Sequence, residues 1–175
     1  MPQISVFDQI PEASKKALEK NEIYALSQVE SGKDWQSLSF AIVGQTNNNC
    51  RDGLRKMSRY ETYSQYVGFI KKSSYDDAKE KVHFELSSSL LPFDMILAFK
   101  LPRIKSPGSY PFSFDSGFLK DLHGVIQVEE RLGKCLFYTT AHWKGPSTGI
   151  PDSVLSFFSQ ALSKLSMENM FRIAK

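Results

Sequence analysis

The 175-residue sequence contains no run of apolar residues that approaches the roughly 20 needed for a helix to cross a membrane. Its only two cysteines, Cys50 and Cys135, show neither CxxC spacing nor a neighbouring pair of histidines. Because zinc sites are built from such clusters, we predict no metal site, and no motif calls for a cofactor. For the cysteines we favour two free, partly buried thiols over a long-range disulfide, which an exported protein would permit.

Motifs for catalysis are absent as well. The sequence has no GxSxG segment, no glycine-rich phosphate loop and no pair of histidines at metal-binding spacing. His83, His123 and His142 fall on the polar faces of expected strands, which indicates structural roles. His83 and Glu85 share one face, but cross-strand pairing explains this as well as an acid–base pair does. We therefore assign no catalytic residue; the sequence favours a protein without enzymatic activity and leaves an enzyme open.

Concentrated positive charge is missing too. The chain carries 22 lysines and arginines against 19 acidic residues, which gives a net charge of +3. The basic residues are dispersed. Lys15–Lys16 and Lys71–Lys72 are isolated pairs, and neither belongs to a longer run of basic residues. A nucleic-acid-binding protein concentrates positive charge on one face, so we expect no nucleic-acid partner. The small positive excess still permits transient contact with an anionic membrane, and the oligomeric state is not indicated.

The N-terminal part has no apolar segment like that of a signal peptide within residues 1–22, which predicts a cytoplasmic protein. If a leader had been removed before the first residue given, a periplasmic or secreted location would follow instead. Residues 11–22 are typical of a short surface helix, whereas residues 23–29 suit either a helix or a strand. We expect an N-terminal extension with a short helix over residues 1–30, followed by one domain over residues 31–175.

Alternation of apolar and polar residues is the main positive signal. It is typical of a sheet with one buried and one wet face, and 13 Phe and 7 Tyr supply bulk for the buried side. Pro107 and Pro111 restrict residues 110–114 to a short edge strand. Two short helices are expected between residues 50 and 66. The seven expected strands cover residues 35–43, 67–73, 80–87, 93–101, 110–114, 122–129 and 134–143.

The chain closes with a long amphipathic helix over about residues 152–173. Pro151 and Asp152 suit the start of a helix. An apolar stripe with a 3.6-residue period comprises Val154, Leu155, Phe158, Ala161, Leu162 and Leu165. The opposite face carries Ser156, Ser159, Gln160 and Ser163. Such a helix can cover the concave apolar face of a curled antiparallel sheet.

The order of these elements resembles the helix-grip fold of the START-like, or SRPBCC, superfamily. This superfamily includes Bet v 1-like plant allergens, polyketide cyclases and lipid-transfer proteins. The resemblance is carried by residues 39–43, by Leu54, Tyr60, Tyr63 and Tyr66, and by residues 66–70 and 150–172. It implies an α+β fold in which a curved seven-stranded antiparallel sheet grips a long C-terminal helix, with two short helices after the first strand. It also implies a cavity for a lipid, sterol, polyketide or similar apolar molecule.

A set of inward-facing positions is predicted to line such a cavity and contact the ligand: Phe84, Met95, Phe99, Ile126, Phe137, Thr139 and Phe158. For the apolar residues on strands, plain core packing is the alternative. Thr139 lies in an otherwise apolar row, where its hydroxyl could orient the polar end of a ligand or could bond to the backbone. The aromatic segment 102–118 would then act as a gate over the cavity mouth.

Three functions fit these patterns. The first is binding or transport of a hydrophobic small molecule, lipid, sterol or polyketide-like, between sheet and helix. The alternative is a cyclase- or aromatase-type enzyme, for which the available groups are the tyrosines of residues 60–66, Thr139 and His83. A further alternative is an interaction domain without a pocket. Whether the space between helix and sheet is hollow or filled separates these functions.

Overall fold

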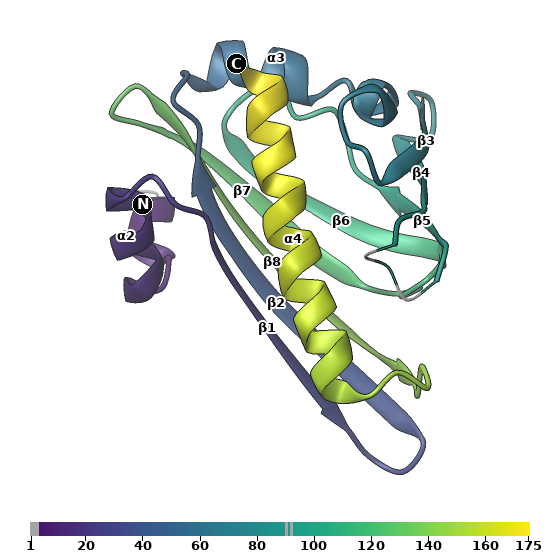
Figure 1. Ribbon diagram of the computed structural model, residues 1–175. Helices are drawn as coiled ribbons and strands as arrows, with labels where there is room; N and C mark the ends of the chain where they lie inside the picture. The colour runs from purple at the N-terminus through teal and green to yellow at the C-terminus, as the bar shows by residue number, and fades with distance from the viewer. Residues whose placement is uncertain (1–3, 90, 92) are drawn as a thin grey trace.

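A computed structural model describes residues 4–89, 91 and 93–175 (Figure 1). The first three residues of the predicted N-terminal extension lie outside the described residues. The elements in chain order are α1 (Val6–Gln9), α2 (Glu12–Glu19), β1 (Tyr24–Ser31), β2 (Trp35–Gln45), α3 (Cys50–Met57), the 3-10 helix η1 (Tyr60–Gln65), β3 (Ile70–Asp76), β4 (Lys81–Leu86), β5 (Met95–Lys100), β6 (Gly108–Gly117), β7 (His123–Arg131), β8 (Lys134–Pro146) and α4 (Asp152–Ala174).

The strands of the described chain form one antiparallel sheet in the order β1-β2-β8-β7-β6-β5-β4-β3. The predicted α+β architecture, with a large antiparallel sheet, short helices and a long C-terminal helix, is confirmed. The sheet has eight strands rather than seven, because the segment that the sequence left undecided forms β1. This strand pairs with β2 along its whole length, from Tyr24 opposite Val43 to Ser31 opposite Gln36.

Strand β6 corrects the predicted short edge strand at residues 110–114. It runs over ten residues in the interior of the sheet, between β5 and β7. Its first half pairs with β7 alone, because β5 ends at Lys100, opposite Ser113. On the side of β6 that has no partner strand, the N–H that proline lacks would form no hydrogen bond in the sheet. Pro111 is therefore tolerated within the strand. The aromatic segment predicted to be a gate is therefore largely part of the sheet.

The two faces of the sheet are covered by different helices. Helix α4 runs across the concave face, with α3 close to its C-terminal end (Figure 1). The N-terminal helices α1 and α2 pack on the opposite face, where a buried cluster joins Ile10, Leu18, Val43 and Leu136. Alternation along β2 and β8 explains this division, because Val43 and Leu136 point away from the face that carries Ile42 and Phe137. Over the described residues, no helix has both the length and the apolar character needed to span a bilayer.

Polar side chains of α4 contact the free edge of β1 in the middle of the helix. The Ser156 hydroxyl donates to the Ser27 carbonyl (3.1 Å), and the Ser27 N–H donates to Oε1 of Gln160 (3.2 Å). An edge strand leaves unpaired backbone groups that need partners. Part of the polar face of the helix therefore completes the hydrogen bonding of β1.

Both ends of α4 are held by amide side chains. At the start, Nε2 of the buried Gln36 donates to the Ile150 carbonyl (2.9 Å) and to Oδ1 of Asp152 (2.8 Å). At the end, Nδ2 of Asn48 donates to the Ala174 carbonyl (2.7 Å). The bond to Ala174 satisfies a carbonyl of the last turn, which has no partner within the helix. All of the donors belong to β2 or to the segment that follows it.

Cys50 and Cys135 form a disulfide, so the prediction of two free thiols is wrong. The bond joins the first residue of α3 to the second residue of β8, and both cysteines are buried. The Cys50 N–H donates to Glu130 (2.8 Å), and the Cys135 N–H donates to Thr46 (3.3 Å). The sequence did not reveal this pair because the two cysteines lie 85 positions apart and meet only when α3 packs against β8.

Removal of this disulfide should destabilise the protein. We expect a Cys50→Ala, Cys135→Ala double variant to lose about 2–5 kcal/mol of unfolding free energy, because its unfolded chain is no longer constrained. Urea denaturation followed by tryptophan fluorescence measures the difference. The matched control is the reductant dithiothreitol, which should lower the midpoint of the wild type and leave that of the double variant unchanged. Equal midpoints for all samples would contradict the prediction.

Arg103, in the segment after β5, joins three parts of the fold. Its guanidinium donates to Glu61 of η1 (2.8 Å), to Asp77 after β3 (2.8 Å) and to the Ser58 carbonyl after α3 (2.7 Å). It also lies over the Tyr75 ring, 4.3 Å from the centroid. Partial burial raises the pKa of Glu61, but the hydrogen bond to Arg103, a backbone hydrogen bond and the positive charge of Arg103 together outweigh it, so the pKa lies below its ordinary value. The same hydrogen bonding lowers the pKa of Asp77.

This cluster predicts a dependence of stability on acid pH. Because both carboxyl groups have a lower pKa folded than unfolded, their stabilisation is present above the unfolded values and disappears as pH falls through the folded values. We expect the difference in unfolding free energy between wild type and Arg103→Gln to shrink as pH falls from about 5 to 2. The change should be small, since Glu61 and Asp77 are 42% and 74% exposed. Urea denaturation at a series of pH values tests this; a difference independent of pH would refute it.

Candidate functional site

The space between α4 and the concave face of the sheet is hollow. A cavity of about 340 Å³ lies there, and its walls come from α3, η1, strands of the sheet and α4. None of the described side chains that line it carries a charge. Phenylalanine and leucine are the commonest lining residues, and the phenylalanines are Phe40, Phe69, Phe84, Phe99, Phe112, Phe114, Phe118, Phe137 and Phe158.

The position of α4 explains why the space is not filled. The helix packs against β1, β2 and α3, which holds it on one side of the sheet. Its side chains Leu155, Leu162, Met167 and Met170 all line the cavity; Leu155 and Met167 are buried, whereas Leu162 and Met170 are only partly buried. At Gly44 the approach is close: an added Cβ would lie 2.6 Å from Sδ of Met167. The helix therefore rests on β2 while strands β4 to β6 form a separate wall.

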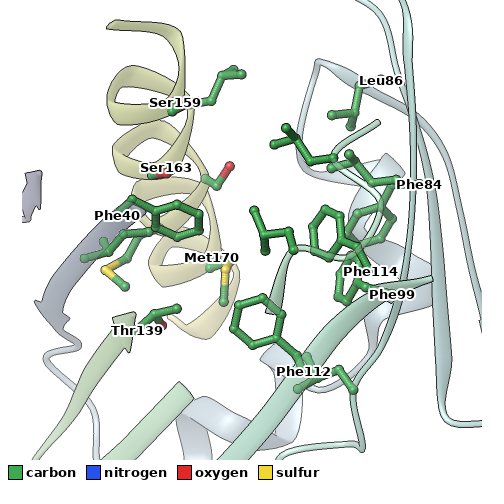
Figure 2. A pocket seen from close by; sticks show the side chains of 18 of the residues that line it. Phe40, Phe84, Leu86, Phe99, Phe112, Phe114, Thr139, Ser159, Ser163 and Met170 are labelled. Carbon is green, nitrogen blue, oxygen red and sulfur yellow. The ribbon is translucent and has the colours of Figure 1, made fainter. Parts of the chain in front are cut away.

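That far wall is a network of aromatic rings. Phe99 of β5 stacks on Phe114 of β6, with ring centroids 5.1 Å apart, and meets Phe84 of β4 edge to face at 5.7 Å. Tyr63 of η1 stacks on Phe84 at 5.7 Å. Figure 2 shows Phe84, Phe99 and Phe114 across the cavity from Ser159 and Ser163 of the helix. Rings that pack on one another in this way form a firm apolar surface.

The two tyrosines of the lining have their hydroxyls occupied. The Tyr60 hydroxyl donates to the Pro102 carbonyl (2.9 Å) and accepts from the Ile104 N–H (3.3 Å). The Tyr63 hydroxyl donates to the Met57 carbonyl. Burial raises the pKa of both phenols, so they remain protonated at neutral pH. These groups are structural, and neither is free to pass a proton to a bound molecule.

Five other hydroxyls in the lining have no such partner. The side chains of Ser58 after α3, Thr139 of β8, and Ser159, Ser163 and Ser166 of α4 make no hydrogen bond to the described part of the chain. Of the two roles considered for Thr139, a backbone hydrogen bond is therefore not formed. These hydroxyls are the polar groups of the cavity that are available to a ligand.

The structure brings all seven predicted site residues together on the cavity wall: Phe84, Met95, Phe99, Ile126, Phe137, Thr139 and Phe158. Their contact with a ligand stays a prediction. The sequence missed Phe40, Phe112 and Phe114, although Phe112 and Phe114 follow the alternation that marks an inward face. It assigned Ser159 and Ser163 to the face of the helix opposite the apolar stripe, which is wrong, because both line the cavity together with Leu155 and Leu162. It did not single out Ser166, although the three serines are spaced four and three positions apart, as residues on one helix face are.

His83 lies on the side of β4 away from the cavity. It alternates with Val82 and Phe84, which are buried on the concave side, and it is not part of the lining. Glu85 forms a salt bridge with Lys72 of β3 (3.4 Å). The cross-strand explanation of the His83–Glu85 spacing therefore fits, and the pair supplies no acid or base to the cavity. No group of three or more metal-ligating side chains occurs among the described residues.

Comparison with known proteins gives matches at the level of structure. No protein-family model matches the chain, and no curated protein matches it in sequence. A START superfamily protein from Mycobacterium smegmatis superimposes with a TM-score of 0.56 at 9% identity, covering 81% of this chain and 97% of its own. The protein Ara h 8.0201 gives a TM-score of 0.55 at 9% identity, covering 87% and 95%. An uncharacterised protein from Bacillus thuringiensis gives 0.53 at 10% identity, covering 78% and 96%.

These likenesses span most of each chain but fall near one identical residue in ten. At that distance they show the fold and leave the function to the site. The overall fold is shared with Ara h 8.0201 and with a START superfamily protein. The chain has the START-like, or SRPBCC, helix-grip fold that its order of elements predicted.

Proposed function

We propose that this protein binds or carries a hydrophobic small molecule in the cavity between α4 and the sheet. The observation that carries the proposal is the cavity itself, about 340 Å³ of apolar space in the centre of the fold. An unfilled space of this size lowers stability and is not needed to hold the elements together. A bound apolar molecule would restore the missing contacts, which supports a role in binding.

The volume limits the size of the ligand. The cavity has a volume of about 340 Å³. Known ligand sites range from about 300 to 1,000 Å³, so this cavity lies near the lower end. A compact lipid, sterol-like or polyketide-like molecule fits this range better than a lipid with two long acyl chains.

The cyclase or aromatase alternative uses the same cavity but gains less support. The hydroxyls of Tyr60 and Tyr63 are bound to backbone carbonyls, and His83 faces away from the lining. Proton transfer needs a titratable group within reach of the reacting atom. The pocketless alternative conflicts with the cavity. Binding is therefore the function that the geometry supports best.

The compartment and a membrane contact belong to the same proposal. A buried disulfide between Cys50 and Cys135 supports an oxidising compartment, and so favours the periplasmic or secreted alternative over the cytoplasm. Phe93 and Phe157 are 43% and 69% exposed, and their neighbours Phe118 and Phe158 line the cavity. Such side chains suit a transient membrane contact during loading of a ligand.

The first test uses N-phenyl-1-naphthylamine, a neutral apolar dye that fluoresces when it leaves water. We expect saturable enhancement with a stoichiometry of about one dye per chain, because the cavity has space for one such molecule. Protein unfolded in urea is the control for non-specific binding. No saturable signal from delipidated, folded protein would contradict the proposed function.

A second test fills the cavity from within. In a Ser163→Phe variant the new ring projects into the cavity from α4, so dye affinity should fall about tenfold or more, which is a loss of about 1.4 kcal/mol. Stability should hold or rise, because apolar area becomes buried. Lys164→Phe, at the exposed neighbouring position, is the matched control and should bind dye like the wild type. Equal affinity in both variants would place the dye outside the cavity.

A further inference from the structure

The serines of α4 form a row within the cavity. Ser159, Ser163 and Ser166 lie within an arc of about 60° on the helix, given 100° per residue, and the row spans about 10 Å along the axis. All three belong to the cavity lining, where Leu155, Leu162 and Met170 are their apolar neighbours. The row therefore presents hydroxyls along one wall of an otherwise apolar space.

The row is unfavourable for a purely apolar ligand. Serine forms helices less well than alanine. None of the three hydroxyls is among the buried, unpartnered side-chain atoms of the described residues, so water can reach them in the empty cavity, and an apolar ligand that displaced this water would leave them without hydrogen bonds. The three serines form no hydrogen bond to a described residue, although backbone carbonyls one turn earlier are the usual partners in a helix. Thr139 of β8 and Ser58 after α3 add two unpartnered hydroxyls from other parts of the fold. A ligand with oxygen atoms would supply the missing partners.

Charge is the second constraint on the ligand. No lysine, arginine or histidine lines the cavity within the described residues, so nothing there would neutralise a carboxylate or phosphate. Moving an ionised group from water into uncharged, apolar surroundings is strongly unfavourable. The lining therefore favours neutral oxygen atoms over charged ones.

The opposite wall defines the rest of the molecule. Phe84, Phe99 and Phe114 present ring faces and edges across the cavity from the serines (Figure 2). Flat apolar groups pack well on such a surface. One wall of the cavity is thus aromatic, and the other offers uncharged hydroxyls.

We infer that the preferred ligand is a neutral molecule with a flat apolar skeleton and two or more hydroxyl or carbonyl oxygens, which Ser159, Ser163 and Ser166 bind along one edge. This inference rests on the proposed function and specifies its ligand. It distinguishes the cavity from a site for ionised fatty acids or phosphorylated lipids.

Three trans-stilbenes of matched shape test the inference: the parent hydrocarbon, the 4,4′-dihydroxy compound and the 4,4′-dicarboxylate. The phenol groups are uncharged at pH 7, whereas the carboxylates are ionised. Substituents at both ends ensure that at least one enters the cavity. We expect displacement of N-phenyl-1-naphthylamine from wild-type protein by the dihydroxy compound, and displacement by the dicarboxylate only at concentrations at least about tenfold higher.

The decisive variant is Ser159→Ala, Ser163→Ala, Ser166→Ala, which retains good helix formers on α4. Its affinity for the dihydroxy compound should fall about fivefold for each hydrogen bond lost, while its affinities for the parent hydrocarbon and the dye stay unchanged. Ser153→Ala, an exposed position in the first turn of the same helix, is the matched control and should change none of the three.

The outcomes separate the two proposals. If wild-type protein binds neither dye nor stilbene, the proposed function fails. If the dye binds but the triple variant weakens the hydrocarbon and the dihydroxy compound equally, or the dicarboxylate binds as tightly as the dihydroxy compound, the inference about the ligand is overturned and the binding function stands. Selective loss of the dihydroxy compound in the triple variant supports both.

Discussion

The attachment of α4 to one side of the sheet is the constraint on which the cavity depends. Gln36 holds the start of the helix, the backbone of Ser27 holds its middle, and Asn48 holds its end. All of these partners lie in β1, in β2 or directly after β2, so the helix is fixed at a distance from β4, β5 and β6. Stacked rings on those strands support one another and need no help from the helix. The space stays hollow because α4 is held by β1 and β2, while the rings on β4, β5 and β6 pack on one another.

The periodicity of apolar and polar residues predicted the strands and the long helix, whose patterns lie in the local sequence. Alternation located the strands of the sheet and placed residues such as Phe84 and Thr139 on the concave face, and a 3.6-residue period located α4. It left β1 undecided, because that strand is fixed by β2 and by Ser156 and Gln160 of a helix more than 120 residues away. Because of Pro111, the predicted strand at β6 was too short. A proline is accepted at this position only because β5 has already ended opposite Ser113, and the sequence does not show that. The Cys50–Cys135 bond depends in the same way on packing between distant segments.

The chemistry of the cavity depends on which polar side chains already form hydrogen bonds or ion pairs within the protein. The hydroxyls of Tyr60 and Tyr63 donate to backbone carbonyls, and both rings are buried parts of the core at the cavity wall. The ionisable side chains of this region, such as Arg103 and Glu61, pair with one another outside the lining. The lining consists of aliphatic and aromatic side chains and a few hydroxyls. A site of this kind selects by shape and by uncharged hydrogen bonds, which favours retention of a cargo over its chemical conversion.

The covalent link between α3 and β8 also sets an order of events during synthesis. Its second cysteine belongs to the last strand of the chain, so the link cannot close until all but the final 40 residues have been made. Until then α3 lacks both of the elements it packs against, β8 and α4. The covalent link can therefore fix α3, and with it the part of the cavity wall that Leu54 and Met57 supply, only after the sheet has received its central strand β8.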